Sequence, residues 1–294
     1  MSKVTITRDM TIAEVLEANP KTADVLRGMG MHCLGCPSAT GESVAGAART
    51  HGMNVEILLE NLNAVEYGEM SEETAQDTLP VGAIVQRDKK TFAVVPHIPA
   101  GLVSPGLLRK IADVAEKYKT AALKLTSGQR IAIVGLTKED VPKIWEELGL
   151  DPGYAAGNFV RNVKVCPGTT FCKRGEQDAV GMGLELDKKY HGVDLPSKLK
   201  IAVSGCSNNC SEAPVRDVGL VGSATGWNLM IGGNVGPKRR IGQIIATGLD
   251  DERAKALVDK VIFHYRRNAK LNERLGAYIE RVGIEEVKKA VLAE

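Results

Sequence analysis

The sequence contains few aromatic residues, only 4% of its 294 residues, and no basic run interleaved with aromatic ones. It therefore lacks the stripe typical of nucleic-acid binding, and we expect no nucleic-acid partner. No apolar stretch approaches the length of a membrane span, and residues 1–10 hold no apolar core of signal-peptide length. These absences predict a cytoplasmic protein without a membrane partner.

Charge is nearly balanced overall, at a net +2, but it is distributed unevenly. Residues 1–80 contain 5 Lys and Arg against 12 Asp and Glu, whereas the remainder contains 33 against 24. A basic body with an acidic N-terminal part suits an anionic cofactor or substrate. The length allows two or three domains.

The first 65 residues predict a small helical module. Thr11 and Glu14 have the spacing of a capping box before a short apolar helix that stops at Pro20. Further helices are expected over 22–29, 37–51 and 55–62. Residues 66–80 are acidic and lack apolar periodicity, so we interpret them as a linker.

From residue 81 the pattern alternates between strands and helices. Strands are expected over 83–86, 91–96, 122–125 and 131–134, and helices over 104–115 and 137–148. This order predicts a ferredoxin-like half domain over 81–150, with helices on a mainly antiparallel sheet. A second α/β unit is expected over 151–294, with strands over 163–165, 198–203, 218–221 and 228–231 and helices over about 170–189 and 250–268.

Four of the six cysteines form two pairs in this second unit. Five residues separate Cys166 from Cys172, and three separate Cys206 from Cys210. Four thiolates are the ligand set of a [4Fe–4S] cluster. Structural zinc also takes four cysteines, but its pairs are usually two to four residues apart, and four unligated buried cysteines remain a further alternative. In a cytoplasmic protein such cysteines favour metal or redox chemistry over structural disulfides.

The order and spacing of these pairs resemble the signature of the sirohaem and [4Fe–4S] nitrite and sulfite reductases. The resemblance extends to the segments 126–131, 159–166, 195–200, 218–222 and 228–234. It implies an α+β fold in which a ferredoxin-like α/β sandwich joins a sirohaem- and [4Fe–4S]-binding α/β domain, with the small all-α domain at the N-terminus. It also implies multi-electron reduction of a small inorganic oxyanion, sulfite to sulfide or nitrite to ammonia.

The resemblance assigns roles to individual residues. Cys166, Cys172, Cys206 and Cys210 would ligate the cluster, with Cys210 also bridging to the sirohaem iron. The positions that would bind and protonate the anion are Arg130, Arg161, Lys198 and Lys200. Partners for the sirohaem carboxylates and ring would be Asn208, Asn234, Lys173, Arg174, Lys238, Arg239 and Arg240; the basic members of this set could equally form a solvated face.

One geometric argument concerns the oligomeric state. The expected strand places Lys198 and Lys200 on one face. Cys206 is six residues beyond Lys200, roughly 20 Å of extended chain. The larger reductases of this family contain two copies of the unit and this chain contains one, so we predict a homodimer with shared sites. A bend near Ser204 would instead allow a site within one subunit.

The remaining pair, Cys33 and Cys36, lies beside His32. The segment 31–38 resembles the short DUF1858-like helical domain of presumed redox-disulfide function found next to hybrid-cluster proteins. Cys36 precedes an expected helix N-terminus, which favours a thiolate. The pair could instead be half of an inter-subunit metal site, or inert.

No Gly-x-Gly-x-x-Gly fingerprint is present, so an external donor, a ferredoxin-like protein or a flavoprotein, is expected to supply electrons. The alternative function is a non-catalytic [4Fe–4S] electron carrier or redox sensor without haem. A zinc-stabilised binding domain is a third possibility.

Overall fold

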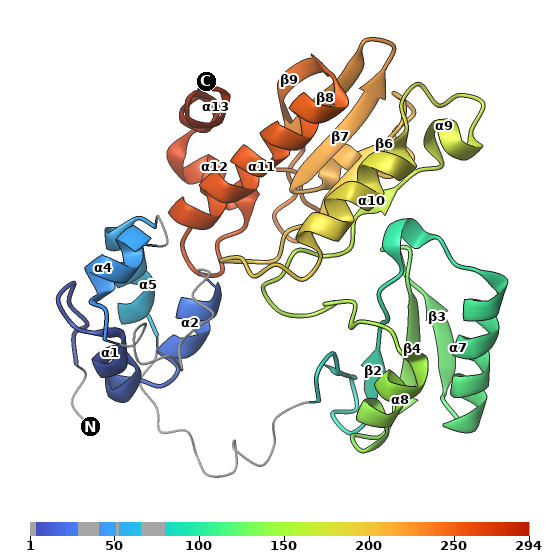
Figure 1. The fold of residues 1–294 in the computed structure, drawn as a ribbon, viewed down its shortest axis with the longest axis horizontal. Helices are drawn as coiled ribbons and strands as arrows, with labels where there is room; N and C mark the ends of the chain where they lie inside the picture. Colours follow the sequence, from blue (N-terminus) through green and yellow to red (C-terminus); the bar gives the residue numbers. More distant parts are fainter. Residues whose placement is uncertain (1–3, 29–40, 51–52, 66–79, 294) are drawn as a thin grey trace. The chain divides into compact units, whose positions relative to one another are not determined.

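The computed structural model describes residues 4–28, 41–50, 53–65 and 80–293, drawn as ribbon in Figure 1. The chain divides into two compact units. The first contains Met1–Asp77, Asp194–Leu199 and Lys255–Glu294, and the second contains Thr78–Val193 and Lys200–Ala254. No helix among the described residues is long and apolar enough to cross a membrane. Cys33 and Cys36 lie outside the described residues.

The first unit is helical. Its elements are α1 (Ile12–Ala18), α2 (Thr22–Gly28), α4 (Val44–Thr50), α5 (Val55–Asn63), most of α11 (Asp251–Asn268), α12 (Leu275–Val282) and α13 (Ile284–Leu292). The predicted capping box is present, because Thr11 and Glu14 each accept a hydrogen bond from the backbone of the other. The apolar faces of α1, α2, α4 and α5 form one buried core, against which Leu271 also packs.

Residues from both ends of the chain meet in this unit. The backbone N–H of Leu271 donates to Oδ1 of Asn61 at 2.8 Å, and Lys270 forms an ion pair with Glu60. Asn54 donates its backbone N–H to the carbonyl of Arg267 at 3.4 Å. The N-terminal helices are therefore attached to the end of α11 (Asp251–Asn268) and to the segment that follows it.

A four-stranded antiparallel sheet begins the second unit. Its strands are β1 (Ile84–Val85), β2 (Phe92–Val94), β3 (Ala122–Leu125) and β4 (Ile131–Leu136), in the order β1-β2-β4-β3. Alternate residues of β2 and β4 share a core with α7 (Pro105–Lys117) and α8 (Asp140–Leu148). Because strand side chains alternate between faces, both helices cover the same face. The expected α+β, ferredoxin-like arrangement is confirmed.

A five-stranded mixed sheet follows in the same unit (Figure 1). Its order is β5 (Lys164–Val165), β6 (Ile201–Ser204), β7 (Val218–Ser223), β8 (Gly226–Ile231) and β9 (Gln243–Leu249). The first three strands are parallel, and β8 and β9 run antiparallel to their neighbours. The strand β9 was not predicted from the sequence.

Two predicted elements differ in the structure. The single helix expected over about 170–189 is two helices, α9 (Gly168–Phe171) and α10 (Ala179–Tyr190), because Asp178 caps a new helix by accepting the N–H of Gly181. The strand expected to begin at Lys198 begins at Ile201. The backbone N–H of Lys200 donates instead to the buried carboxylate of Asp217 at 2.8 Å.

Candidate active site

Two neighbouring parallel strands place the cysteine pairs at one edge of the five-stranded sheet. Cys166 directly follows β5, and Cys206 follows β6 by two residues. Val165 is opposite Val203 in the parallel register. Parallel strands end at the same edge, so the first cysteines of both pairs emerge together.

Glycines allow the two cysteine loops to approach closely. A Cβ at Gly205 would lie 2.6 Å from the carbonyl oxygen of Gln177 and 2.9 Å from Cα of Gly168. A Cβ at Gly175 would lie 2.5 Å from both the carbonyl carbon of Gly168 and the nitrogen of Thr169. These contacts are with backbone atoms that cannot swing aside, so the cradle requires glycine.

The backbone of Gly205, in the second cysteine loop, is hydrogen-bonded to the first cysteine loop. Its N–H donates to Sγ of Cys166 at 3.0 Å, and its carbonyl accepts the backbone N–H groups of Glu176 and Gln177 at 2.8 and 2.9 Å. A backbone N–H directed at a cysteine sulfur stabilises a thiolate, which is the form that binds metal.

The four thiols differ in exposure in a way that fits a large cofactor. Cys166 and Cys206 are buried, Cys172 is half-buried and Cys210 is exposed. Tetrahedral zinc would require sulfurs about 3.8 Å apart. Among the described residues, no three of these thiols have their sulfurs within 4.8 Å of one another. Thiols on two neighbouring loops that are too far apart for one tetrahedral ion fit a multi-iron cluster better.

The turn between Cys206 and Cys210 presents a further polar group. Asn209 adopts a left-handed backbone conformation, with φ of 56°, and its buried Oδ1 has no hydrogen-bond partner in the protein. An unpaired buried acceptor is costly, so this position is suited to a bound group.

A cavity of about 170 Å³ lies between the ferredoxin-like sheet and the start of β5 and β6. It brings together three of the four predicted anion-binding residues: Arg130, Arg161 and Lys200. Two further cations, Lys164 and Arg216, also line it and were not predicted. Lys164 stands two residues before Cys166 within a segment already singled out, whereas no sequence motif marks Arg216. Lys198 belongs to the other compact unit, where its side chain is exposed.

Arg130 is positioned by the loop that precedes β4. Gln129, at a positive φ of 60°, forms two hydrogen bonds with the backbone of Val165, at 2.7 and 2.9 Å. This contact attaches the loop to β5. The Arg130 guanidinium then donates to the carbonyl of Gly153 while its buried Nε has no partner. Burial lowers the pKa of Arg130, and the charge of Asp187 opposes this.

Arg161 is held by the backbone of the segment 154–157. Its guanidinium donates to the carbonyls of Tyr154, Ala156 at 2.7 Å and Gly157 at 2.8 Å. Its side chain thus closes this segment around a fixed positive charge. Arg161 therefore both holds the segment 154–157 and adds a positive electrostatic potential to the cavity.

Lys164 and Arg216 share one carboxylate. Glu212 lies 3.1 Å from Nζ of Lys164 and 2.5 Å from the guanidinium of Arg216. The hydrogen bond from Lys164 lowers the pKa of Glu212, so this group is an anion at neutral pH. The cavity therefore has five cations and one neighbouring carboxylate, an arrangement that attracts small anions.

Comparison with known proteins assigns the two parts of the chain that form the cysteine loops and the cavity to one family. A family model described as "Nitrite and sulphite reductase 4Fe-4S domain" matches residues 156–294, which include all four cysteines, and a ferredoxin-like half domain of nitrite and sulfite reductases matches 84–150. The assimilatory-type sulfite reductase of Nitratidesulfovibrio vulgaris is 46% identical over 213 residues, 72% of this chain and 98% of that protein. The chain belongs to the nitrite and sulfite reductase family.

Other members of the family are longer. An NAD(P)H nitrite reductase of Bacillus subtilis is 41% identical over 209 residues, which are 71% of this chain but only 26% of that protein. The fold also matches two solved structures at low identity. These are the Mycobacterium tuberculosis NirA protein, with a TM-score of 0.61, 21% identity and coverage of 68% of this chain and 39% of that one, and dissimilatory sulfite reductase I, with 0.63, 15% and 84% of each chain.

Family membership identifies the chain as a sulfite and nitrite reductase-type oxidoreductase whose cofactors are a [4Fe–4S] cluster and sirohaem. The predicted N-terminal resemblance is also confirmed, because a domain of unknown function, DUF1858, matches residues 6–59. The acidic module is thus a second family joined to the reductase.

The residues predicted to contact sirohaem differ in exposure. Asn208, Lys173, Arg174 and Arg239 are exposed. Asn234 is buried and acts locally, since it accepts a hydrogen bond from Arg240 at 3.0 Å and donates to the carbonyl of Lys238 at 2.8 Å. This pair closes the hairpin between β8 and β9, so Asn234 has a structural partner already.

Proposed function

We propose that Cys166, Cys172, Cys206 and Cys210 hold the [4Fe–4S] cluster, with Cys210 shared with sirohaem, and that the cations of the cavity bind sulfite or nitrite. The support is that Cys166 and Cys206 follow neighbouring parallel strands at one edge of the sheet, where the close approach of glycines joins the two cysteine loops. Exposed Cys210 has the free side that a second cofactor needs.

The cofactors, when bound, supply the electrons and the iron at which a sulfite or nitrite ion is reduced. The residues of the chain do the rest. Arg130 and Arg161 cannot lose a proton at neutral pH, so they bind and orient oxyanion oxygens. Lys200 and Lys164 carry ammonium protons at Nζ that can transfer to the oxyanion as it is reduced. Glu212 holds Nζ of Lys164 in place through an ion pair of 3.1 Å.

A first experiment separates this function from its alternatives. The protein, purified without oxygen, is examined by visible spectroscopy and by iron and sulfide analysis, and turnover of sulfite and nitrite is measured with reduced methyl viologen. Sirohaem bands with four irons and turnover are expected. Iron–sulfur absorption without haem in sirohaem-producing cells would indicate an electron carrier, and a colourless zinc protein would refute both functions.

The cavity is tested by a matched pair of variants. Arg130→Gln should raise the KM for both anions by at least about tenfold, because a charge-assisted hydrogen bond is worth about 1.5–3 kcal/mol. Arg253→Gln removes an exposed cation on α11 and should leave KM unchanged. If both substitutions raised the KM equally, the loss of one positive charge anywhere on the protein would explain the effect.

The active form is a homodimer with shared sites. Lys200 stands just before β6 and Cys206 just after it, so cations and cysteines lie toward opposite ends of this strand. A second copy would supply one set to the other. Mixed subunits carrying Arg130→Gln and Cys206→Ser should recover about a quarter of the activity by forming one intact site per heterodimer. No recovery, or a fully active monomer, would contradict this.

Electrons come from an external protein, and the Cys33–Cys36 pair passes them as a redox disulfide. The name of one relative supports the first point, since the nitrite reductase of Haloferax mediterranei is described as ferredoxin-dependent. Replacing both cysteines with serine should slow turnover with a protein donor and leave turnover with methyl viologen unchanged. Unchanged turnover with both donors would exclude the role.

A further inference from the structure

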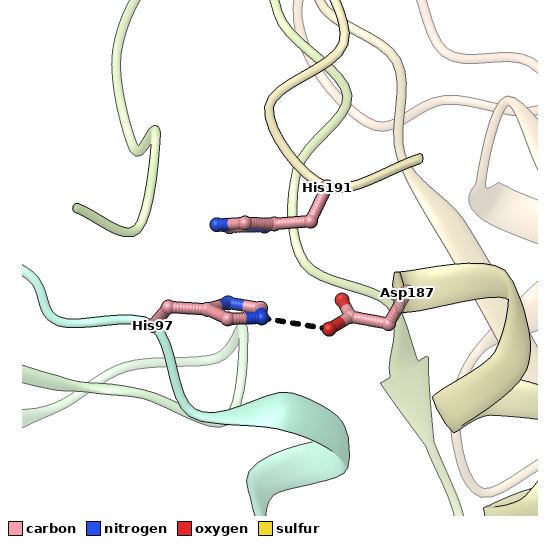
Figure 2. A group of neighbouring side chains, drawn as sticks. All are labelled: His97, Asp187 and His191. Carbon is pink, nitrogen blue, oxygen red and sulfur yellow. Dashed lines mark ion pairs between the residues drawn. The ribbon is translucent and has the colours of Figure 1, made fainter. Parts of the chain in front are cut away.

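A group of titratable side chains, two partly buried histidines and one buried aspartate, lies outside the lining of the cavity and is used by none of the steps above. His97, Asp187 and His191 have ligand atoms within 4.8 Å of one another (Figure 2). The two imidazole rings are stacked, with centroids 3.4 Å apart and planes inclined by 21°. Nε2 of His97 lies 2.8 Å from Oδ2 of Asp187.

Asp187 fixes one ring. Its carboxylate is only 1% exposed and accepts the backbone N–H of Val163 at 2.8 Å through the other oxygen, Oδ1. Because the Val163 N–H occupies Oδ1, Oδ2 is the oxygen that faces Nε2 of His97, and an acceptor there favours the tautomer of His97 with its hydrogen on Nε2.

The second ring has a different environment. Nε2 of His191 lies 3.2 Å from the carbonyl of Pro152, which selects the tautomer with its hydrogen on Nε2. Burial lowers the pKa of His191, and a charge on His97 and the charge of Arg130 lower it further, while the Pro152 carbonyl and Asp187 act against them. The Nδ1 atoms of both rings are buried without a partner.

The segment 151–157 connects these rings to the arginines of the cavity. The stacked pair binds its first two carbonyls, since the backbone N–H of His97 donates to Asp151 at 3.0 Å and the His191 ring faces Pro152. The arginines bind carbonyls further along, Arg130 at Gly153 and Arg161 at residues 154, 156 and 157. A shift of the segment would therefore move both guanidinium groups.

Ring stacking argues against a metal ion as the occupant. The lone pairs of imidazole nitrogens lie in the ring planes, so in two nearly parallel, stacked rings they lie in two separate, nearly parallel planes. An ion bound about 2.0–2.1 Å from both nitrogens would lie well outside both planes. A proton needs only one ring, which suits the observed geometry.

We propose that His97, His191 and Asp187 form a one-proton site that positions the segment 151–157, and that a second proton opens the ring stack and weakens oxyanion binding. The inference rests on the proposed function of the cavity. Two imidazolium rings at 3.4 Å would repel each other, and Arg130 and Arg161 would lose the carbonyls that hold them. The two histidines are positioning residues.

The test uses the holoenzyme and nitrite, which stays an anion over the range studied. The KM is measured from pH 5 to pH 8 for the wild type and for His191→Gln, whose amide can still donate to Pro152 but cannot titrate. Below the pKa of His191 the wild-type KM should rise, by up to about tenfold per pH unit, while the variant stays flat. His264→Gln is the matched control, because His264 is also a partly buried histidine with a lowered pKa but lies in the other compact unit.

The second measurement needs no turnover. The wild type should lose thermal stability as the pH falls below about 6.5, because His191 has a lowered folded-state pKa, and His191→Gln should lose less. The proposal is overturned if His191→Gln keeps the wild-type pH dependence of KM. If His191→Gln does not fold, His97→Gln is used with the same expectation. Absence of nitrite turnover in every protein, with the stability difference intact, would count against the proposed function and not against the proton site.

Discussion

Replacing Gly205 with alanine should separate the two cysteine loops. The new Cβ would be placed 2.6 Å from the Gln177 carbonyl oxygen and 2.9 Å from Cα of Gly168, both backbone atoms. Overpacking of this kind typically costs about 1–3 kcal/mol. Moving the Gly205 peptide would also weaken its hydrogen bond to Sγ of Cys166, a charge-assisted bond worth about 1.5–3 kcal/mol when the sulfur is a thiolate.

Iron and sulfide content and the urea unfolding midpoint measure this effect. Gly205→Ala should lose much of its cluster and unfold at lower urea. Gly106→Ala is the control, because a Cβ at that helical position meets only Oγ of Ser104, at 3.8 Å. Alanine should stabilise the helix there by about 0.5–1 kcal/mol. Full cluster occupancy and an unchanged midpoint in Gly205→Ala would refute the role assigned to the glycine cradle.

Three further predictions concern the cavity. Gln129→Ala should lower the free energy of unfolding by about 1–3 kcal/mol, since it leaves the N–H and carbonyl of Val165 without partners, and urea unfolding measures this. Arg130→Lys keeps the charge but loses the planar fork, so KM for sulfite should rise severalfold, and an unchanged KM would show that charge alone suffices. Glu212 has a lowered folded-state pKa, so its contribution is complete above about pH 4.5 and is lost as the pH falls through the folded value. Unfolding of the wild type should therefore be more acid-sensitive than that of Glu212→Gln, by a small amount because Glu212 is largely exposed.

The sheet edge at which Cys166 and Cys206 emerge (the cysteine edge) was predictable because it depends on the local sequence before each cysteine. Apolar residues before Cys166 and Cys206 indicate strands, and parallel strands that end in cysteine place both pairs together. The helix prediction over 170–189 was wrong because it depended on periodicity alone. The cap at Asp178, and the need for the loop of Gly175 to fit under Gly205, divide that segment, and tertiary contacts of this kind leave no periodic signal.

The cavity was predictable only in part. Arg130, Arg161 and Lys200 were found by resemblance, but Arg216 reaches the cavity through its pairing with Glu212, a contact that no motif records. The histidine stack was missed for the same reason. His97 and His191 are separated by most of the second unit in sequence, and single histidines carry no pattern of their own.

The helical unit is built from both ends of the chain, and this affects the order of events during synthesis. The N-terminal helices emerge early, but their contacts at Asn61 and Glu60 require Leu271 and Lys270. The unit can be completed only once residues 255–294 have been made, after all of the second unit has left the ribosome. The strands that carry the cysteines and the cavity can therefore fold before the N-terminal helices make their contacts with residues 255–294.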